Sequence, residues 1–206
     1  MKRQVSALIL MLTVSVAALA AQAPRGWLYR ADGSTDASDP DAPGSIQLMA
    51  MGSGFHVVTP QAAVFWNPAN MASGTYTLKG TFTLLKPSGH TNYYGIVFGG
   101  SALDNAAQKY SYFLVAQNGT FLVKQRNGNA ATDVVGRTAN AAVRRPDDSG
   151  RSVNDLEVRV GADKIDYVVN GTVVHSGPKA GQPTDGLWGF RSNHLLEVQV
   201  DKLAKQ

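Results

Sequence analysis

The chain has no cysteine among its 206 residues. It can therefore form no disulfide, no thiolate metal site and no cysteine nucleophile, and it offers no cysteine for an N-terminal lipid anchor. Glutamate is also scarce, because Glu157 and Glu197 are the only two. A chain of this size can bury a sufficient core without cross-links. The first shortage excludes thiol chemistry, and the second leaves only two glutamates as candidates for catalysis by paired carboxylates.

Long apolar runs are absent after residue 20. The one before it, residues 7–19, follows Lys2 and Arg3 and leads to a small-x-small sequence that ends at Ala20. This pattern predicts a signal peptide over residues 1–20, cleaved near Ala20, and hence a periplasmic or secreted protein. The run is shorter than the roughly 20 apolar residues of a membrane helix. We therefore expect no membrane span in the mature chain.

Excess charge of either sign is lacking too. Loss of Lys2 and Arg3 removes two of the 19 basic residues and none of the 15 acidic ones, which leaves a net charge of +2. No segment of the sequence carries a stripe of Lys and Arg residues along it. Nucleic acid is therefore not expected as a partner.

Residues 21–45 are predicted to be a leader that contains an acidic, turn-forming loop. The loop lacks the D-x-[DN]-x-[DN]-G spacing of a calcium loop, and the histidines show no HExxH or other close ligand spacing. We therefore predict neither a metal site nor a cofactor, and structural calcium remains the alternative for the loop. The residues concerned are Asp32, Asp36, Asp39, Asp41, His56, His90, His175 and His194.

Short runs rich in Val, Thr, Phe and Tyr alternate with Gly, Asn, Pro and Ser from residue 46 to the end. No helical period is sustained, and only residues 105–109 could form a turn or two of helix. This pattern predicts an all-β fold, a two-sheet antiparallel β-sandwich in one domain over residues 46–206. The expected strands are 46–50, 55–59, 62–66, 75–85, 93–99, 110–117, 120–126, 153–160, 164–169, 172–176, 186–191 and 195–201.

Two Asn-Gly pairs predict two-residue hairpin loops, at residues 118–119 and 170–171. That loop length would place Val115 opposite Leu122 in the first hairpin and Asp166 opposite His175 in the second. The Asp166–His175 pair could be an acid/base couple or a surface ion pair. Both hairpins are expected to supply central strands.

The order of these segments resembles the concanavalin A-like lectin/glucanase superfamily, whose fold is a two-sheet jelly roll. More narrowly, it is similar to the domain of unknown function 1080 group, described as 3-keto-disaccharide hydrolases or family-16-like glycoside hydrolases. The resemblance covers roughly residues 46–203 and implies a sugar-related function. It rests on "YTLKGTFTL", "NYYGIVFGG", "YSYFLVAQNGTFLVKQR", "VNDLEVRVGADKIDYVVNGTVVHSG" and "GLWGFRSNHLLEVQVDKL".

Paired carboxylates for glycoside hydrolysis are hard to find. The family-16 motif E-x-D-x-(x)-E is missing, although catalysis of this kind needs two carboxyl groups about 5–10 Å apart. Glu157 is expected to point away from the core beside Arg159 in "LEVRV". Glu197 and Asp201 share one face of "EVQVD", but they would lie about 13 Å apart along the strand. These three carboxylates are weak catalytic candidates, and no catalytic residue is assigned.

Sugar binding needs only aromatic platforms and a few converging polar groups. The candidates lie in "FWN", "HTNYYG" and "LWGFRSNH", and each aromatic could belong to the core instead. Trp66 ends a predicted strand and is expected to be exposed, while one of the two tyrosines is expected to be buried. The candidate ligand-binding residues are Trp66, His90, Asn92, Tyr93, Tyr94, Trp188, Arg191 and Asn193.

The sequence therefore favours a secreted or periplasmic jelly-roll domain that binds a saccharide or glycoconjugate on its concave sheet without catalysis. A hydrolase acting on a keto-disaccharide or glucan is the first alternative. A structural or partner-binding domain without sugar affinity is the second.

Overall fold

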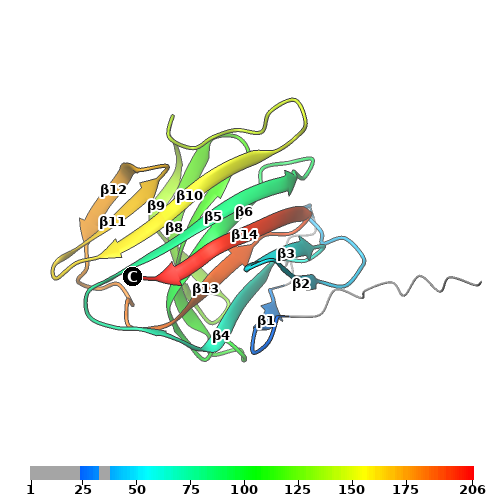
Figure 1. The fold of residues 1–206 in the computed structure, drawn as a ribbon. Helices are drawn as coiled ribbons and strands as arrows, with labels where there is room; N and C mark the ends of the chain where they lie inside the picture. Colours follow the sequence, from blue (N-terminus) through cyan, green and yellow to red (C-terminus); the bar gives the residue numbers. More distant parts are fainter. Residues whose placement is uncertain (1–23, 33–37) are drawn as a thin grey trace, which may run out of the picture.

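The computed structural model describes residues 24–32 and 38–206, and their strands form two antiparallel sheets of seven (Figure 1). The first sheet has the order β1-β4-β13-β6-β7-β8-β9 and the second has the order β12-β11-β10-β5-β14-β3-β2. The strands are β1 (Leu28–Ala31), β2 (Gln47–Met51), β3 (Gly54–Thr59), β4 (Ala63–Ala72), β5 (Tyr76–Lys86), β6 (Tyr93–Ser101), β7 (Lys109–Ala116), β8 (Thr120–Asn127), β9 (Ala130–Ala139), β10 (Ser152–Val160), β11 (Lys164–Val169), β12 (Thr172–Pro178), β13 (Gly186–Ser192) and β14 (Leu196–Lys205).

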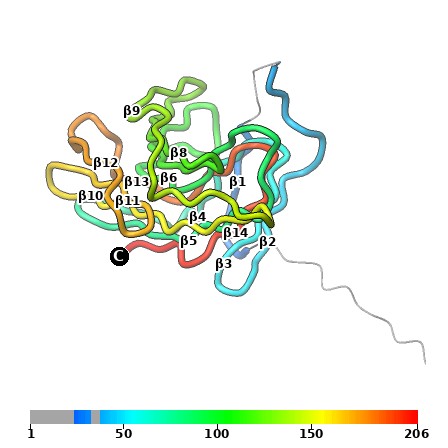
Figure 2. The backbone as a smooth tube through the Cα atoms, turned by 90° about the horizontal axis from the view of Figure 1, so that it is seen from above, coloured from blue at the N-terminus to red at the C-terminus, as the bar shows by residue number. Residues whose placement is uncertain are grey.

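Alternating apolar residues hold the two sheets together. In β5, Leu78, Phe82 and Leu84 are buried in the core, whereas Thr81 between them points to the outer face. This two-residue period turns one face of each strand inward, so that the strand buries its apolar side chains against the facing sheet. Viewed from above, β5 and β14 run along one side of the molecule and β6 and β8 along the other (Figure 2). The predicted two-sheet sandwich is confirmed.

Two strands of the structure were not predicted from the sequence. Apart from two adjacent valines, strand β9 consists of Ala, Thr, Asp, Gly and Arg and is largely exposed at the edge of its sheet, so it lacks the alternating apolar signal of a strand. Strand β1 lies within the predicted leader and pairs with β4, with Leu28 opposite Trp66. The described part of residues 24–45 thus contributes to the sandwich.

The hairpin at Asn118-Gly119 has a different register from the predicted one. Its loop has three residues, 117–119, with Gly119 at φ +83°, and Val115 pairs with Phe121 rather than Leu122. The side chain of Asn118 accepts hydrogen bonds from the backbone N and the hydroxyl of Thr120 at 3.2 and 2.7 Å. The side chain of Asn118 therefore stabilises the loop, although the backbone of Asn118 is not left-handed. Because the loop has one residue more than predicted, every cross-strand pair is shifted by one residue.

The hairpin at Asn170-Gly171 has the predicted loop, because both residues are left-handed, at φ +50° and +82°. A bulge after Tyr167 then places Asp166 opposite Ser176, whose hydroxyl donates to the Asp166 carboxylate at 2.6 Å. The predicted Asp166–His175 pair is therefore wrong. The expectation of central strands is also wrong here, since β12 forms an edge of its sheet.

Some sequence predictions concern residues that the structure does not describe. The predicted signal peptide and Asp36 lie outside the described residues. Within residues 24–32 and 38–206, no helix reaches the length and apolarity that a membrane crossing would need.

Candidate functional site

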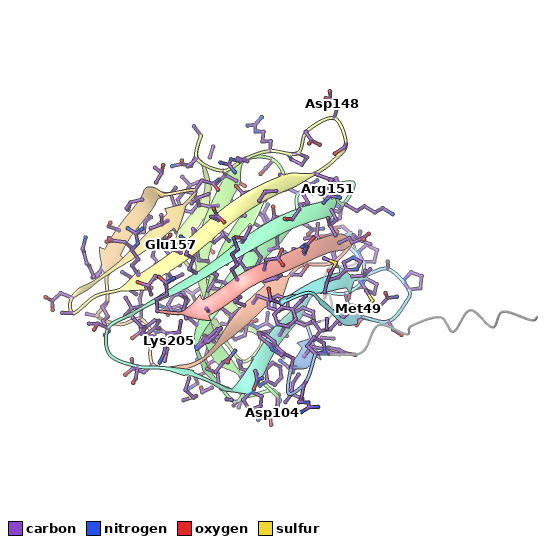
Figure 3. The ribbon with its side chains drawn as sticks, in the orientation of Figure 1. Met49, Asp104, Asp148, Arg151, Glu157 and Lys205 are labelled. Carbon is purple, nitrogen blue, oxygen red and sulfur yellow. The ribbon has the colours of Figure 1, made fainter. Side chains whose placement is uncertain are left out.

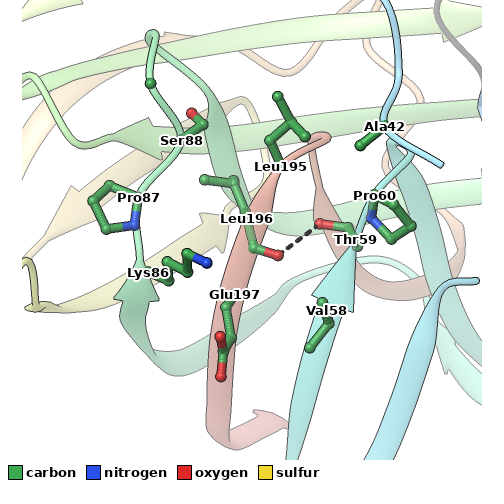
Figure 4. Close-up of a pocket in the computed structure, with 11 residues that line it drawn as sticks. Ala42, Val58, Thr59, Pro60, Lys86, Pro87, Ser88, Leu195, Leu196 and Glu197 are labelled. Carbon is green, nitrogen blue, oxygen red and sulfur yellow. Dashed lines mark hydrogen bonds between the residues drawn. The ribbon is translucent and has the colours of Figure 1, made fainter. Parts of the chain in front are cut away.

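A cavity of about 380 Å³ opens at one end of the sandwich, where β3 and β5 end and β14 begins (Figure 4). In the close-up, Lys86 and Pro87 lie on one side of the cavity, Thr59 and Pro60 lie on the other, and Leu195 stands between them. This volume is in the range of small-molecule sites, about 300–1,000 Å³. The lining residues are Ala42, Val58, Thr59, Pro60, Lys86, Pro87, Ser88, Gly89, Leu195, Leu196 and Glu197.

Leu195 is an unusual residue at this cavity. Its backbone is left-handed, at φ +58°, and its side chain remains 36% exposed. A left-handed backbone costs an L-residue about 1–2 kcal/mol, and leucine has no polar atom to offset that cost locally. Because strained backbone gathers at binding sites and because an exposed leucine offers apolar contact area, Leu195 makes this cavity a candidate ligand site.

Thr59 fixes the turn that carries Leu195. It is fully buried, and its hydroxyl lies 2.6 Å from the carbonyl oxygen of Asn193, 3.2 Å from that of Leu196 and 2.9 Å from the hydroxyl of Ser192. Asn193 also donates its backbone N–H to the carbonyl of Tyr93 at 2.9 Å. The 193–195 turn is thus tied to both sheets, which holds the cavity rim in place.

The polar groups of the cavity come from different strands. Lys86 of β5 lies opposite Glu197 of β14 in the sheet. Glu197 also contacts His56 of β3, with 2.8 Å between the carboxylate oxygen and Nε2. Charged groups held next to apolar walls are the arrangement that binds small polar molecules with apolar faces.

Asn92 connects the cavity to a neighbouring cluster of histidines. This buried side chain donates to the hydroxyl of Ser88 at 3.1 Å and to the carbonyl oxygen of His194 at 2.9 Å. The segments "HTNYYG" and "LWGFRSNH", which were predicted separately, therefore meet here. His90, Asn92 and Asn193 lie together beside the cavity.

The predicted aromatic platforms lie elsewhere. Trp66 and Tyr93 are only 4% and 2% exposed and pack in an apolar cluster on the outer side of the first sheet. Tyr94 and Trp188 belong to the core between the sheets. The expectation that Trp66 is exposed is wrong, because β4 continues to Ala72 and places Trp66 between β1 and β13. Both tyrosines are buried, where one was expected.

Arg191 is likewise buried, in an ion-pair network with Asp32. Gln108 and Tyr110 donate to the two oxygens of this carboxylate, each at 3.0 Å. Burial alone raises the pKa of Asp32, but Arg191, Gln108 and Arg126 together hold it below its usual value. Burial also raises the pKa of Tyr110 to about 12, which keeps its hydroxyl a donor. This network stabilises an ionised carboxylate inside the fold.

Of the three weak catalytic candidates, Glu157 is unsuited to act as a general acid. It projects from the outer face of the second sheet (Figure 3), with Lys79 at 2.8 Å and Arg159 at 2.6 Å. Partial burial raises the pKa of Glu157, but hydrogen bonds from these two cations lower it below its usual value overall. A general acid needs the opposite shift. Glu157 is therefore ionised and paired near neutral pH.

Glu197 and Asp201 are arranged as predicted. Val198 and Val200 are buried, while the polar residues between and beside them face outward. Asp201 accepts a hydrogen bond from Gln199 at 2.7 Å and does not line the cavity. Of these three carboxylates, Glu197 alone is at the cavity.

Replacing Glu157 by glutamine tests this assignment. Because Glu157 is on β10 and outside the cavity lining, we expect saccharide affinity and any sugar release to stay within about twofold of the parent protein. Titration calorimetry and a reducing-sugar assay on the same samples measure both quantities. A tenfold loss of either one would place Glu157 in the functional site.

Of the residues that line the cavity, sequence reasoning singled out only Glu197, and it missed Lys86, Ser88 and Leu195 among others. Lys86 and Ser88 lie in one segment and Leu195 in another, and nothing in their local pattern marks the two segments as neighbours. Register between β3, β5 and β14 brings them together, and that register could not be read from the sequence.

Comparison with solved structures shows a shared fold. A carbohydrate-binding module, CBM66 from Bacillus subtilis, is similar with a TM-score of 0.61 and 11% identity, over 88% of this chain and 95% of the module. A candidate glycosyl hydrolase from Parabacteroides distasonis has a TM-score of 0.54 and 10% identity, over 87% and 98% of the two chains. Sheep galectin-11 has a TM-score of 0.50 and 12% identity, over 66% and 93%. No family model and no curated protein matches the sequence. The chain has a galectin-like, concanavalin A-like jelly-roll fold.

Proposed function

We propose that this protein is a secreted or periplasmic binding protein that holds a saccharide or glycoconjugate in the cavity between Lys86 and Pro60, without hydrolysing it. The exposed, left-handed Leu195 at the cavity carries the proposal. A sugar ring presents apolar C–H faces and a rim of hydroxyls. Leu195 and the two prolines offer apolar contact to the faces, and Lys86, Ser88 and Glu197 offer partners to the hydroxyls.

One observation supports saccharide as the ligand class, and another supports the place of the site. The similar structures include a carbohydrate-binding module and a galectin. The cavity, rather than the face of the first sheet, is the proposed site because Trp66 and Tyr93 on that face are covered. A covered aromatic cannot stack on a sugar ring.

A hydrolase acting on a keto-disaccharide or glucan is the second candidate, and Glu197 at the cavity favours it. Such a mechanism needs a second carboxyl group within about 10 Å of the first. The cavity lining contains no aspartate and no other glutamate among the described residues. Binding without turnover is therefore the better supported function.

Leu195→Gly separates ligand binding from folding. Glycine relieves the left-handed strain of about 1–2 kcal/mol while raising the entropy of the unfolded chain, so we expect the free energy of unfolding to change by less than about 1 kcal/mol. The same change removes the apolar contact, and we expect the Kd for the saccharide to rise at least about tenfold. Urea unfolding and titration calorimetry measure the two effects.

Val173→Ala is the matched control, since Val173 is an exposed aliphatic residue on β12, away from the cavity. It should leave the Kd unchanged. If Leu195→Gly folds normally and binds the saccharide as well as Val173→Ala does, the cavity is not the binding site.

A further inference from the structure

Beside the cavity, three ligand atoms from distant segments converge on one point. Nε2 of His90 lies 3.0 Å from Nε2 of His194, and Oδ1 of Asp39 lies 2.9 Å from the first nitrogen and 3.2 Å from the second. The residues come from the acidic loop, the segment before β6 and the turn before β14. The two imidazole rings meet edge to face, at 83°.

Hydrogen bonds alone do not account for the short distances within this triangle of two nitrogens and one oxygen. Each Nε2 has a single in-plane position, which holds either a proton or a lone pair. Nε2 of His90 nevertheless lies at hydrogen-bond distance from both Nε2 of His194 and Oδ1 of Asp39, and Nε2 of His194 lies at such a distance from Nε2 of His90 and Oδ1 of Asp39. One position cannot serve two partners at once, so the three short distances are better explained by a shared central partner.

We propose that Asp39, His90 and His194 bind one divalent transition-metal ion, with zinc as the best fit. An ion about 2.1 Å from each of the three atoms would cap the triangle with angles of roughly 90–100° between ligands, which lie between octahedral and tetrahedral values. Two imidazoles and one carboxylate favour zinc and its neighbours in the transition series over calcium and magnesium, which prefer all-oxygen sites. Three protein ligands leave at least one coordination position open.

Asp41 contacts His194 on the side of the ring that faces away from the proposed ion. Its carboxylate oxygen lies 3.0 Å from Nδ1 of His194, on the opposite side of the ring from the proposed ion. A carboxylate at this position holds Nδ1 protonated, which directs the Nε2 lone pair toward the metal. His194 is buried and Asp41 is partly buried, so both are fixed in place before an ion arrives.

The test is zinc binding by protein purified without a histidine tag, in competition with a chromophoric chelator. We expect one zinc ion per chain in the parent protein. His90→Gln and Asp39→Asn should each raise the Kd for zinc at least about tenfold, and Asp41→Asn should raise it about 10- to 100-fold. The side chains of His90 and Asp39 are 41% and 44% exposed, so these two variants should fold. Cobalt(II) absorption in the visible range gives a second readout of nitrogen coordination.

His175→Gln is the matched control, because it removes a histidine on β12 that is outside the cluster. It should bind zinc as the parent does. The proposal is overturned if the parent binds less than about a tenth of an equivalent, or if the double variant His90→Gln/Asp39→Asn retains the parent affinity. Zinc binding is measured without saccharide, so this proposal and the saccharide proposal can fail separately.

Discussion

Replacing Asp32 by alanine is expected to lower the free energy of unfolding by about 3–5 kcal/mol. The change leaves Arg191 buried without its partner, and it removes the acceptor of Gln108 and Tyr110. A buried guanidinium without a counter-charge is costly because water no longer solvates it. Urea unfolding monitored by tryptophan fluorescence measures the difference.

Asp133→Ala is the control for this result. Asp133 pairs with Lys124 at 2.9 Å, but its side chain is 55% exposed, so its loss should cost less than about 1 kcal/mol. If Asp32→Ala costs no more than Asp133→Ala, the buried network does not stabilise the fold.

The same carboxylate makes stability depend on pH. Because the pKa of Asp32 is lower in the folded protein than its ordinary value of 3.8, its contribution is complete above that value. The contribution is lost as the pH falls through the lower folded pKa. The stability difference between the parent and Asp32→Asn should therefore shrink below about pH 3.8.

Phe190→Ala is the second change with a large expected effect, again about 3–5 kcal/mol of unfolding free energy. Phe190 is buried and stacks on Phe65 with 4.6 Å between ring centroids. Phe55 and Trp27 also lie against it, at 5.7 and 5.6 Å. Removing the ring opens a cavity where both sheets and the segment before β1 meet, and it also removes aromatic contacts.

Phe190→Leu serves as the comparison, because it keeps most of the apolar volume and should cost clearly less than alanine. Chemical denaturation of both variants measures the two costs. Equal costs for the two variants would show that lost apolar volume does not set the cost at this position, and an alanine cost below about 1 kcal/mol would contradict the packing described for this cluster.

Sequence reasoning was strongest where apolar residues alternate. Strands such as β5 and β14 carry that alternation plainly, and the direction of Glu157, Glu197 and Asp201 followed from it. The sequence reasoning failed where a single extra residue changes the pairing register of two strands. The three-residue loop at 117–119 shifts the first hairpin, because Asn-Gly alone does not specify loop length. The bulge after Tyr167 shifts the second hairpin although its loop is the predicted one.

The candidate site was predictable only in part. His90, Asn92 and Asn193 were singled out for their chemistry, and the structure brings them to one end of the sandwich. Asp39 was considered only as one aspartate of an acidic loop that could bind calcium, and Leu195 was expected to begin a strand, so neither was linked to these residues. The absence of close histidine spacing predicted no metal site, yet residues 90 and 194 meet through the pairing of β13 with β6.

The most direct test of the account is incubation of the purified protein with a panel of soluble polysaccharides and of ordinary and keto-disaccharides. Melting-temperature shifts and released sugar are followed in the same samples, with Leu195→Gly in parallel. We predict a concentration-dependent shift for at least one saccharide, no released sugar, and loss of the shift in Leu195→Gly. Sugar release by the parent protein would establish a hydrolase and make Glu197 the first residue to change. No shift with any saccharide would contradict the binding function and leave a structural or partner-binding domain.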